Sequence, residues 1–325
     1  MRVKTPIRWG IIGCGAVTEV KSGPAYQQVA GFELSAVMRR NEKLAKEYAH
    51  RHGVEKYCTN AEELIADKSI DALYIATPPD THKQYGVMVA NAGKPCCIEK
   101  PLAPSFEDAR DIVDAFEHAK TPLFVAYYRR SLPRFAEIKK NLALGVIGAT
   151  RHIQWQLNRQ VSDKDLAGER HWRTDAQVAP GGYFDDLACH GLDLFAHLLG
   201  DYEHASGHSA SQQQLYTAKD AVVASWIHTN GVTGSGCWNF ASASRKDDVV
   251  ITGSEGEIQF SVFEEQAIHI RNASGEQSIN IANPTNIQLH HVQNMHEQLV
   301  NSVPHPSTGT TALHTNWVMH SILSA

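Results

Sequence analysis

A lysine stands between an apolar run and a proline in the first third of the 325-residue chain. Residues 95–101 read Pro-Cys-Cys-Ile-Glu-Lys-Pro. The apolar part of this run predicts a short buried strand, which Pro101 prevents from continuing. Because the carboxyl ends of the strands in a parallel sheet face the ligand crevice, Lys100 is well placed for chemistry there. The alternative is an ordinary surface lysine beside a turn proline.

A second group of candidate residues lies in 181–200, where glycines precede a helical pattern and another glycine ends it. Four polar residues have the spacing of one helix face: Asp186, His190, Asp193 and His197. Asp186 and His190 are suited to form an oriented carboxylate–imidazole pair for general acid–base catalysis. Two other interpretations stay open: a divalent-metal site, although no cysteine or second histidine pair is placed to complete it, and a solvated helix face.

A glycine-rich turn follows the first predicted strand, residues 7–12. Gly13 and Gly15 allow the backbone to approach a pyrophosphate closely, and a helix that begins near Val17 presents unpaired N–H groups to this anion. Thr18 replaces the third glycine of the usual dinucleotide fingerprint. The turn is expected to bind the cofactor through Gly13, Cys14, Gly15, Ala16 and Val17.

The second predicted strand, residues 32–38, ends in two arginines. A carboxylate at this position would bind the ribose 2′-hydroxyl of NAD. The guanidinium groups of Arg39 and Arg40 would instead pair with the 2′-phosphate of NADP. The sequence therefore predicts NADP as the preferred cofactor, with NAD possible. The alternative is a pair of solvated arginines at the start of a helix.

These candidate residues need a scaffold, and the first part of the chain predicts an α/β fold. Strands and helices alternate through residues 7–126, which is typical of a doubly wound parallel sheet. Three loops at strand ends, 13–18, 77–82 and 99–101, are expected to meet at one crevice. The middle loop contributes Thr77, Pro78 and His82 to the predicted cofactor site.

The rest of the chain predicts an α+β domain with a large, mostly antiparallel sheet. Residues 148–157 alternate with a period of two, and several strand-like runs follow between 215 and 282. Asn230-Gly231 is typical of a two-residue hairpin turn. Because helices are expected on one face of this sheet only, we expect a second subunit on the other face, in a homodimer or homotetramer. The predicted domains are 1–128, for the dinucleotide, and 129–325, for substrate and oligomerisation.

Composition narrows the classes of protein that need consideration. The chain is 42% hydrophobic and 20% charged, with a formal net charge of −5, so it offers no basic surface for nucleic acid or an anionic membrane. No signal peptide and no apolar run of membrane-spanning length is found in the sequence. The six cysteines have no CxxC spacing and are expected to be reduced. These features predict a cytoplasmic protein with neither nucleic-acid nor membrane partners.

Five motifs occur in an order that resembles the glucose–fructose oxidoreductase / inositol 2-dehydrogenase / rhizopine-catabolism (Gfo/Idh/MocA) family. They are Gly13-Cys14-Gly15, Ala76-Thr77-Pro78-Pro79, Glu99-Lys100-Pro101, His171-Trp172-Arg173 and Gly181-Gly182-x-x-x-Asp186-x-x-x-His190-x-x-Asp193. The resemblance covers nearly the whole chain. It implies a Rossmann fold for the first domain.

The resemblance also implies roles for individual residues. Lys100 resembles the catalytic lysine of the family, with a cis bond to Pro101, and Asp186 and His190 resemble its acid–base partners, which also bind substrate. Further positions resemble the cofactor lining: Gly13, Gly15, Thr77, Pro78, Glu99, Trp172 and Arg173. Tyr128 is expected at the substrate, and Tyr128 and Arg129 are candidates for the cofactor lining as well. Arg39 stands where NAD-using members usually carry Asp, in line with the charge argument above.

The sequence thus predicts an NAD(P)-dependent dehydrogenase or reductase that acts on a secondary alcohol or ketone of a sugar, polyol or cyclic diol. Hydride would pass between nicotinamide and the carbinol carbon. Lys100, His190 and Asp186 would handle the proton, with no resident metal. Two alternatives share the fold: a non-catalytic dinucleotide-sensing regulator, and a redox-neutral lyase or glycosidase that uses the cofactor transiently.

Overall fold

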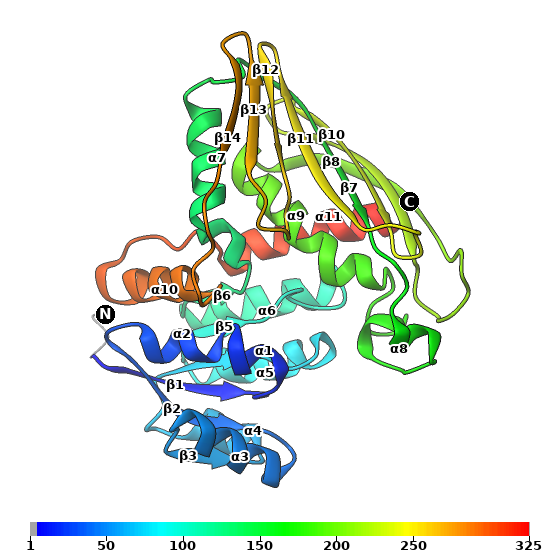
Figure 1. The fold of residues 1–325 in the computed structure, drawn as a ribbon. Helices are drawn as coiled ribbons and strands as arrows, with labels where there is room; N and C mark the ends of the chain where they lie inside the picture. Colours follow the sequence, from blue (N-terminus) through cyan, green and yellow to red (C-terminus); the bar gives the residue numbers. More distant parts are fainter. Residues whose placement is uncertain (1–4, 325) are drawn as a thin grey trace. The chain divides into compact units, whose positions relative to one another are not determined.

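The computed structural model describes residues 5–324, which form two compact units (Figure 1). The first unit contains the chain up to Leu132 together with Pro284–Leu313, and the second contains Pro133–Asn283 together with the chain from His314 onward. The sequence predicted a second domain of 129–325, whereas the structure groups 129–132 and Pro284–Leu313 with the first unit. The reason is packing: helix α10 (Leu289–Asn301) lies against α2 (Gly23–Gln28) of the first unit.

The first unit is built on a six-stranded parallel sheet with the order β3-β2-β1-β4-β5-β6. Its strands are β1 (Ile7–Ile12), β2 (Phe32–Met38), β3 (Lys56–Cys58), β4 (Ala72–Ile75), β5 (Cys96–Ile98) and β6 (Leu123–Val125). Strands β1, β2 and β5 match the strands expected at 7–12, at 32–38 and in the apolar run before Glu99, and β4 and β6 fit the alternation expected through residues 7–126. Strand β3 was not predicted, because it is a three-residue edge strand with two exposed side chains.

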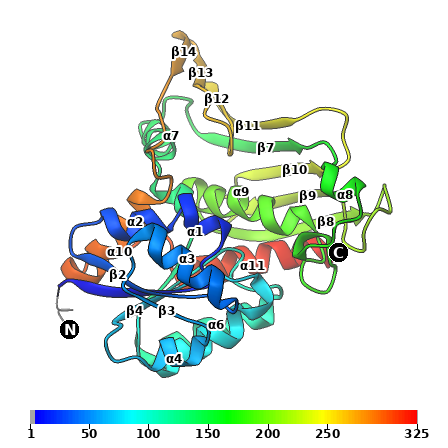
Figure 2. The ribbon, with the colours of Figure 1, turned by 60° about the horizontal axis from the view of Figure 1, so that its bottom comes forward.

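Two groups of helices cover this sheet (Figure 2). One group contains α1 (Ala16–Val20), α2 and α10, and the other contains α4 (Ala61–Ala66), α5 (His82–Asn91) and α6 (Phe106–Ala119). Helix α3 (Glu42–His52) packs on β2 and β3. The 3₁₀ turns η1 (Pro79–Thr81) and η2 (Tyr128–Ser131) complete the unit. Apolar side chains of β1, β2 and β4 pack with Val292 and Met295 of α10 in one core, which is why this late helix belongs here.

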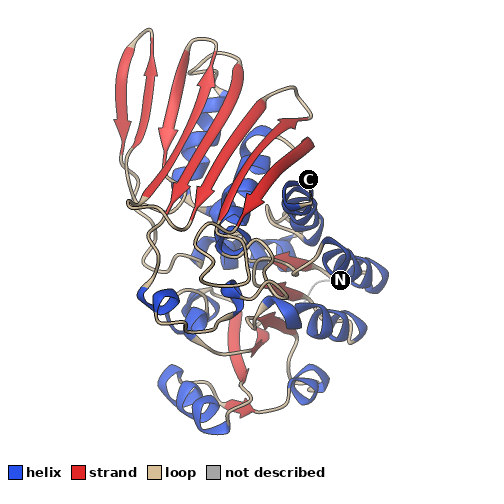
Figure 3. Ribbon diagram, turned by 90° about the vertical axis from the view of Figure 1, so that its right-hand side faces the viewer, coloured by secondary structure: helices blue, strands red, loops and turns tan. Residues whose placement is uncertain are grey.

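The second unit is built on an eight-stranded sheet, drawn in red in the upper part of Figure 3. The strand order is β14-β13-β12-β11-β7-β10-β9-β8, and every neighbouring pair is antiparallel except β7 and β10. The strands are β7 (Thr150–Asn158), β8 (Tyr202–Ala210), β9 (Ala221–His228), β10 (Thr233–Asn239), β11 (Lys246–Gly253), β12 (Gly256–Phe260), β13 (Ile268–Asn272) and β14 (Gly275–Ile279). The antiparallel pair β9–β10 confirms a hairpin at Asn230-Gly231, but residues 229–232 connect the two strands, so the predicted two-residue turn is too short.

Helix α9 (Tyr183–Leu199) packs on one face of this sheet. A Cβ atom on Gly191 would lie 2.3 Å from the ring of Trp155 on β7, so only glycine permits this close approach. Phe195 on α9 and Trp238 on β10 also contact Trp155 edge-to-face. The unit also contains α7 (Pro133–Ala143), α8 (Asp163–Leu166), η3 (Trp172–Thr174) and most of α11 (Gly309–Leu323). The buried aromatic layer fixes α9, and with it Asp186 and His190.

The fold class predicted from the sequence is confirmed: a parallel doubly wound sheet in one unit and a large, mostly antiparallel sheet in the other. Within residues 5–324, none of the helices has the length and apolar character needed to cross a membrane.

Candidate functional site

The turn after β1 has the backbone geometry that the glycine pattern predicts. Gly13 has φ = +93°, and a Cβ atom there would lie 2.7 Å from the side chain of Thr77, so this turn touches the loop after β4. Gly15 precedes α1 in extended backbone, and a Cβ at this position would meet only the Gly13 carbonyl oxygen, at 3.8 Å. The Thr18 N–H donates to the Gly15 carbonyl oxygen at 3.1 Å, so only the N–H groups of Ala16 and Val17 precede the first intrahelical hydrogen bond of α1. The turn therefore fits a bound pyrophosphate.

The two arginines lie at the carboxyl end of β2. The Arg39 side chain donates a hydrogen bond to the Cys14 carbonyl oxygen at 3.3 Å, which places its guanidinium beside the glycine turn. Arg40 is exposed. Neither arginine has an ion-pair partner in the described part of the chain. Cys14 itself is buried, and burial raises the pKa of its thiol to about 11, so this cysteine is neutral near pH 7.

Glu99 follows β5 and is the centre of a buried hydrogen-bond network. Its carboxylate accepts from the Tyr74 hydroxyl at 2.5 Å and from the Gln288 side-chain amide at 3.2 Å. The backbone N–H of Lys100 donates to the other carboxylate oxygen at 3.2 Å. The Lys100–Pro101 bond is cis, as predicted. This network fixes the backbone that carries Lys100.

Tyr74 and Gln288 were not among the residues predicted for the site. Tyr74 lies on β4 next to β5 and is completely buried. In the sequence it stands within an apolar strand, where an aromatic residue indicates only a place in the core. Burial, followed by the nearby Glu99 charge, raises the pKa of Tyr74 well above its usual value, so its hydroxyl keeps its proton and remains a donor. Gln288 precedes α10 and is 1% exposed. No sequence signal connects it with Glu99.

His82 was predicted to contact the cofactor, but the structure gives its ring other partners. The side chain is completely buried. One ring nitrogen lies 2.9 Å from the carbonyl oxygen of Thr77, and the other lies 3.1 Å and 3.2 Å from those of Pro101 and Leu102. Burial lowers the pKa of His82. The ring therefore links the loops after β4 and β5.

Asp186 and His190 lie one turn apart on α9, and both are buried, as is Asp193. The proposal of a solvated helix face is therefore wrong. Asp186 accepts a hydrogen bond from Arg173 Nε at 2.5 Å, and the Arg173 guanidinium lies 4.4 Å from the centre of the Trp172 ring. The structure thus joins two motifs that are separate in the sequence.

The remaining residues of the polar stripe are divided among different partners. The Thr315 hydroxyl on α11 donates to Asp193 at 3.2 Å, and His197 lies within 3.5 Å of Lys139 on α7. The His190 ring packs edge-to-face with Phe263. No group of three His, Cys, Asp or Glu side chains within residues 5–324 is arranged to hold a metal ion.

Asp185 is a further buried acid that the sequence analysis did not single out. Its carboxylate accepts a hydrogen bond from the Gly181 N–H at 2.8 Å. Burial, together with the neighbouring Asp186 charge, raises the pKa of Asp185 to about 7. Two adjacent aspartates on α9 therefore differ in their partners: Asp186 has the Arg173 guanidinium, and Asp185 has a backbone amide.

Tyr128 and Arg129 begin η2, directly after the last strand of the parallel sheet. The Arg129 guanidinium lies 4.9 Å from the centre of the Tyr128 ring, and the Arg129 side chain is buried. Tyr128 is partly exposed. The stacked pair keeps the Tyr128 ring in one orientation.

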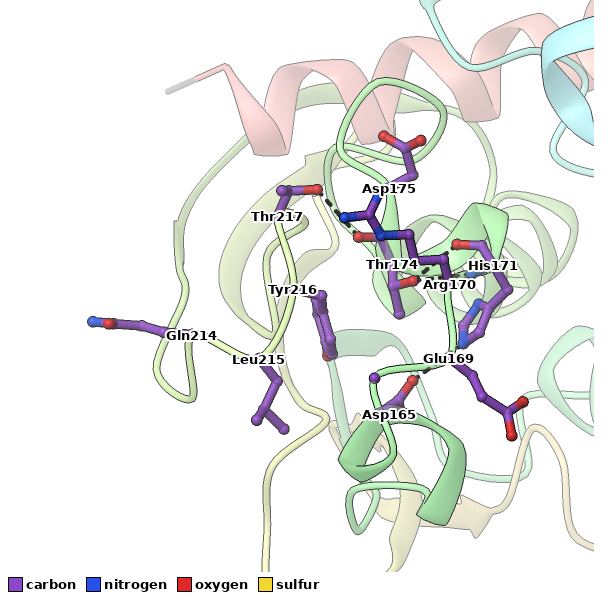
Figure 4. Close-up of a pocket in the computed structure, with 11 residues that line it drawn as sticks. Asp165, Glu169, Arg170, His171, Thr174, Asp175, Gln214, Leu215, Tyr216 and Thr217 are labelled. Carbon is purple, nitrogen blue, oxygen red and sulfur yellow. Dashed lines mark hydrogen bonds and ion pairs between the residues drawn. The ribbon is translucent and has the colours of Figure 1, made fainter.

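A cavity of about 770 Å³ lies in the second unit beside η3 (Figure 4). Its wall includes His171 and Asp165, whose Nε2 and Oδ1 atoms are 3.1 Å apart. The Tyr183 hydroxyl, at the start of α9, donates to the same carboxylate at 2.9 Å. These contacts, with one from the Ser162 hydroxyl, hold the pKa of Asp165 below its usual value against the opposing effect of burial.

Comparison with known proteins agrees with this architecture. Residues 7–127 match the family model described as "Oxidoreductase family, NAD-binding Rossmann fold", and residues 135–259 match that of the GFO/IDH/MocA C-terminal domain. An "Oxidoreductase P35" from Formosa agariphila is 39% identical over 287 residues, which cover 88% of each chain. A 1,5-anhydro-D-fructose reductase from Ensifer adhaerens is 28% identical, over 86% of this chain and 84% of the relative.

Solved structures show the same fold. A levoglucosan dehydrogenase in complex with NADH and levoglucosan superposes with a TM-score of 0.86 at 21% identity, over 97% of this chain and 96% of the other. An oxidoreductase from Agrobacterium radiobacter in complex with NAD⁺, L-tartaric acid and magnesium gives 0.85 at 22% identity, over 98% and 95%. The prediction of an NAD(P)-dependent dehydrogenase or reductase acting on CH–OH groups is in line with these relatives. The chain belongs to the Gfo/Idh/MocA family of oxidoreductases.

Proposed function

We propose that this chain is an NADP-preferring dehydrogenase or reductase that interconverts a secondary alcohol and a ketone on a sugar, polyol or cyclic diol. The observation that carries the proposal is the arrangement at the carboxyl edge of the parallel sheet. There the Gly13 turn touches Thr77, and the buried Glu99 network fixes the backbone of Lys100 two strands away from β1.

The cofactor residues follow from this arrangement. Gly13, Cys14, Gly15, Ala16 and Val17 would hold the pyrophosphate, and Arg39 and Arg40 would pair with the 2′-phosphate because no carboxylate stands at the end of β2. The remaining residues proposed to line the cofactor are Thr77, Pro78, Glu99, Lys100, Trp172 and Arg173. His82 would act by holding the Thr77 and Pro101 loops in place.

When bound, the nicotinamide would accept hydride from the carbinol carbon in one direction and return it to the ketone in the other. In the oxidative direction His190 would take the alcohol proton as the C–O double bond forms, while the Lys100 ammonium stabilises the developing negative charge on oxygen. Asp186 would fix the position of the reacting hydroxyl, and Arg173 keeps that carboxylate in one place. Tyr128 would contact the substrate.

The test is an absorbance assay at 340 nm of sugars, polyols and cyclic diols with NADP⁺ and with NAD⁺. We expect reduction of the cofactor, with kcat/KM at least tenfold higher for NADP⁺. Equal efficiency with both cofactors would refute the preference. Tight cofactor binding without turnover of any substrate would favour the dinucleotide-sensing regulator, and product formation without net reduction would favour the redox-neutral lyase or glycosidase.

We also propose that the chain is a cytoplasmic homo-oligomer that associates through the second face of the large sheet. Val223 and Ile227 on β9 are exposed by 49% and 38%, and Cys237 on β10 is paired with Val223 in the sheet register. Apolar side chains on an open sheet face favour burial against a second copy. Light scattering should give a dimer or tetramer. A Val223→Glu variant should shift it towards monomer, whereas a wild-type monomer at all concentrations would exclude the proposal.

A further inference from the structure

A smaller cavity of the second unit lies against α9, close to Asp186 and His190. Its volume is about 120 Å³, far below the roughly 300–1,000 Å³ of sites that enclose a whole ligand. Leu187, which follows Asp186 on α9, forms part of its wall. The other lining residues are Leu157, Arg159, Arg245, Asp247, Phe263 and Glu264, and all of them belong to the second unit. A space of this size suits one substituent of a ligand whose remainder lies outside it.

Phe263 joins this cavity to the candidate acid–base residues. Its ring packs edge-to-face with the ring of His190, and the ring centres are 5.9 Å apart. Its backbone N–H donates to Asp247 at 2.6 Å, which holds the backbone that carries the ring. A substrate whose hydroxyl faced His190 would therefore have its neighbouring atoms near the cavity.

The alternation of side chains along β7 directs Arg159 towards this cavity. Arg159 directly follows the strand, and its N–H donates to the Asn239 carbonyl oxygen on β10 at 2.9 Å, so the hydrogen bonding of the sheet extends to this residue. Successive side chains of a strand point to opposite faces, so Arg159 shares a face with Trp155 and Leu157. Both are buried, and the close approach of Gly191 to Trp155 identifies this face as the one that α9 covers (Figure 2).

A second arginine stands opposite Arg159 on the neighbouring strand. Strand β11 is antiparallel to β7 with Lys246 opposite Asn158, so one further step of the register sets Arg245 opposite Arg159. Like charges directly opposite each other destabilise a pair of strands. Glu264 forms an ion pair with Arg245, so the chain itself compensates one of the two charges.

The charge of Arg159 stays uncompensated. Its side chain is partly buried, and its guanidinium has no ion-pair or hydrogen-bond partner in the described part of the chain. Asp247, the other carboxylate of the wall, has both oxygens occupied by neutral donors. Trp155 Nε1 donates to one at 2.9 Å, and the Ser261 hydroxyl and the Phe263 N–H donate to the other. Because a partly desolvated cation without a partner is unfavourable, the cavity favours an anion.

One uncompensated guanidinium in a small space favours a carboxylate among the anions. A guanidinium and a carboxylate are both planar and pair through two parallel N–H···O hydrogen bonds. The single negative charge of a carboxylate matches the charge of Arg159, whereas a phosphate monoester carries roughly 1.5–2 negative charges near pH 7. Leu157, Leu187 and Phe263 would cover the carbon atoms next to the carboxylate.

We infer that the substrate is an acidic sugar whose carboxylate occupies this cavity and pairs with Arg159. This inference rests on the proposed function, because it names the substrate class of that same reaction. Arg159 would determine specificity: it holds the substrate and takes no part in the transfer of hydride or proton. Such a contact is made equally in the bound substrate and in the transition state, so its loss raises KM more than it lowers kcat.

The first test uses the full chain with NADP⁺ or NAD⁺ and three pairs of sugars that differ only in whether one carbon is CH₂OH or a carboxylate. The pairs are D-glucose and D-glucuronate, D-galactose and D-galacturonate, and D-glucitol and D-gluconate. We expect kcat/KM to be about tenfold or more higher for at least one acid than for its neutral partner. D-Glucose 6-phosphate is added to distinguish a phosphate from a carboxylate.

Two variants of Arg159 and one control assign this preference to the cavity. Arg159→Gln should bring the ratio of acid to neutral sugar close to one, mainly by raising KM for the acid. Arg159→Lys keeps the charge without the planar fork and should retain part of the preference. Arg151→Gln should leave the ratio as in wild type, since Arg151 is an exposed arginine near the start of the same strand and does not line the cavity.

Saturation-transfer NMR with NADPH, which cannot accept hydride, measures binding without turnover and separates this inference from the proposed function. Signals of an acid that weaken in Arg159→Gln but not in Arg151→Gln support the carboxylate site even if no sugar is oxidised. Turnover of neutral sugars without preference for any acid would overturn the inference and leave the proposed function standing. The inference would also be overturned by binding of none of the acids, by a preference that survives in Arg159→Gln, or by a larger gain for D-glucose 6-phosphate than for D-glucuronate.

Discussion

Replacing Tyr74 by phenylalanine tests whether Glu99 is held as a buried, charged acceptor. The substitution removes only the hydroxyl, which donates to Glu99 Oε1 at 2.5 Å, and keeps the ring that packs on Tyr26. Hydrogen bonds to a charged group contribute about 1.5–3 kcal/mol, against about 0.5–1.5 kcal/mol for a neutral pair. Since Glu99 is only 8% exposed, water cannot easily replace the lost donor. We expect Tyr74→Phe to lower the free energy of unfolding by about 2–3 kcal/mol.

The same unit contains a matched control. Tyr48 is also completely buried, and its hydroxyl donates at 2.9 Å to a neutral acceptor, the Thr18 carbonyl oxygen. Tyr48→Phe should therefore cost about 1 kcal/mol. Urea denaturation followed by circular dichroism at pH 7 gives both values, provided that the m-values agree with wild type.

A double-mutant cycle tests whether the larger loss of stability in Tyr74→Phe comes from the interaction between Tyr74 and Glu99. Combining Tyr74→Phe with Glu99→Gln should give a coupling energy of about 1 kcal/mol or more. Equal losses for Tyr74→Phe and Tyr48→Phe, with no coupling to position 99, would show that Glu99 is not a charged acceptor. That result would remove the network as the reason why the Lys100 backbone is fixed.

Three further experiments follow from the structure. Lys100→Met should lower kcat about 10²–10⁴-fold while the Kd for cofactor, measured by fluorescence titration, stays close to wild type; near-normal kcat would exclude the assignment. Arg39→Asp should lower kcat/KM for NADP⁺ at least tenfold and improve that for NAD⁺, because the carboxylate repels the 2′-phosphate; an unchanged ratio would mean that Arg39 does not face the adenosine ribose. Burial lowers the pKa of His305 to about 4, so the unfolded chain binds a proton that the folded chain does not between about pH 6.5 and 4. Stability should therefore fall as the pH falls through this window, by roughly 3 kcal/mol from His305 alone, and urea titrations of His305→Asn should show a shallower fall than wild type.

Most of the parallel sheet could be predicted from the sequence because its strands are buried on both faces. Strands β1 and β2 have the predicted bounds, and their sequences are mainly apolar, interrupted only by Arg8 in β1 and by Glu33 and Ser35 in β2. The edge strand β8 is different: it reads Tyr-Glu-His-Ala-Ser-Gly-His-Ser-Ala, and only Tyr202 and Gly207 in it are buried. Its formation depends on β9, its single neighbour, so local composition gives no signal.

The residues of the candidate site divide in the same way. Lys100, Asp186 and His190 could be predicted because each belongs to a short segment whose residue types suggest chemistry. Lys100 lies between an apolar run and a proline, and Asp186 and His190 have the spacing of one helical turn. The contact between Arg173 and Asp186 could not be predicted from the sequence, because η3 and α9 are separate elements and only the folded structure brings them together. His82 had the right residue type and position, but its complete burial between two loops could not be predicted from a breaker-rich sequence.

Gln288 shows why part of the candidate site cannot be predicted from local sequence patterns. An amphipathic pattern predicts that α10 has an apolar face, but it does not say which surface covers that face. The surface is the core beneath β1 and β2, and the resulting fit places Gln288 against a carboxylate 189 residues earlier in the chain. Glu99 is buried near the end of a strand, where an uncompensated charge would destabilise the unit. Its charge is thus stabilised by a residue from the far end of the chain. The packing that places the segment Pro284–Leu313 in the first unit therefore also supplies a hydrogen-bond partner for Glu99.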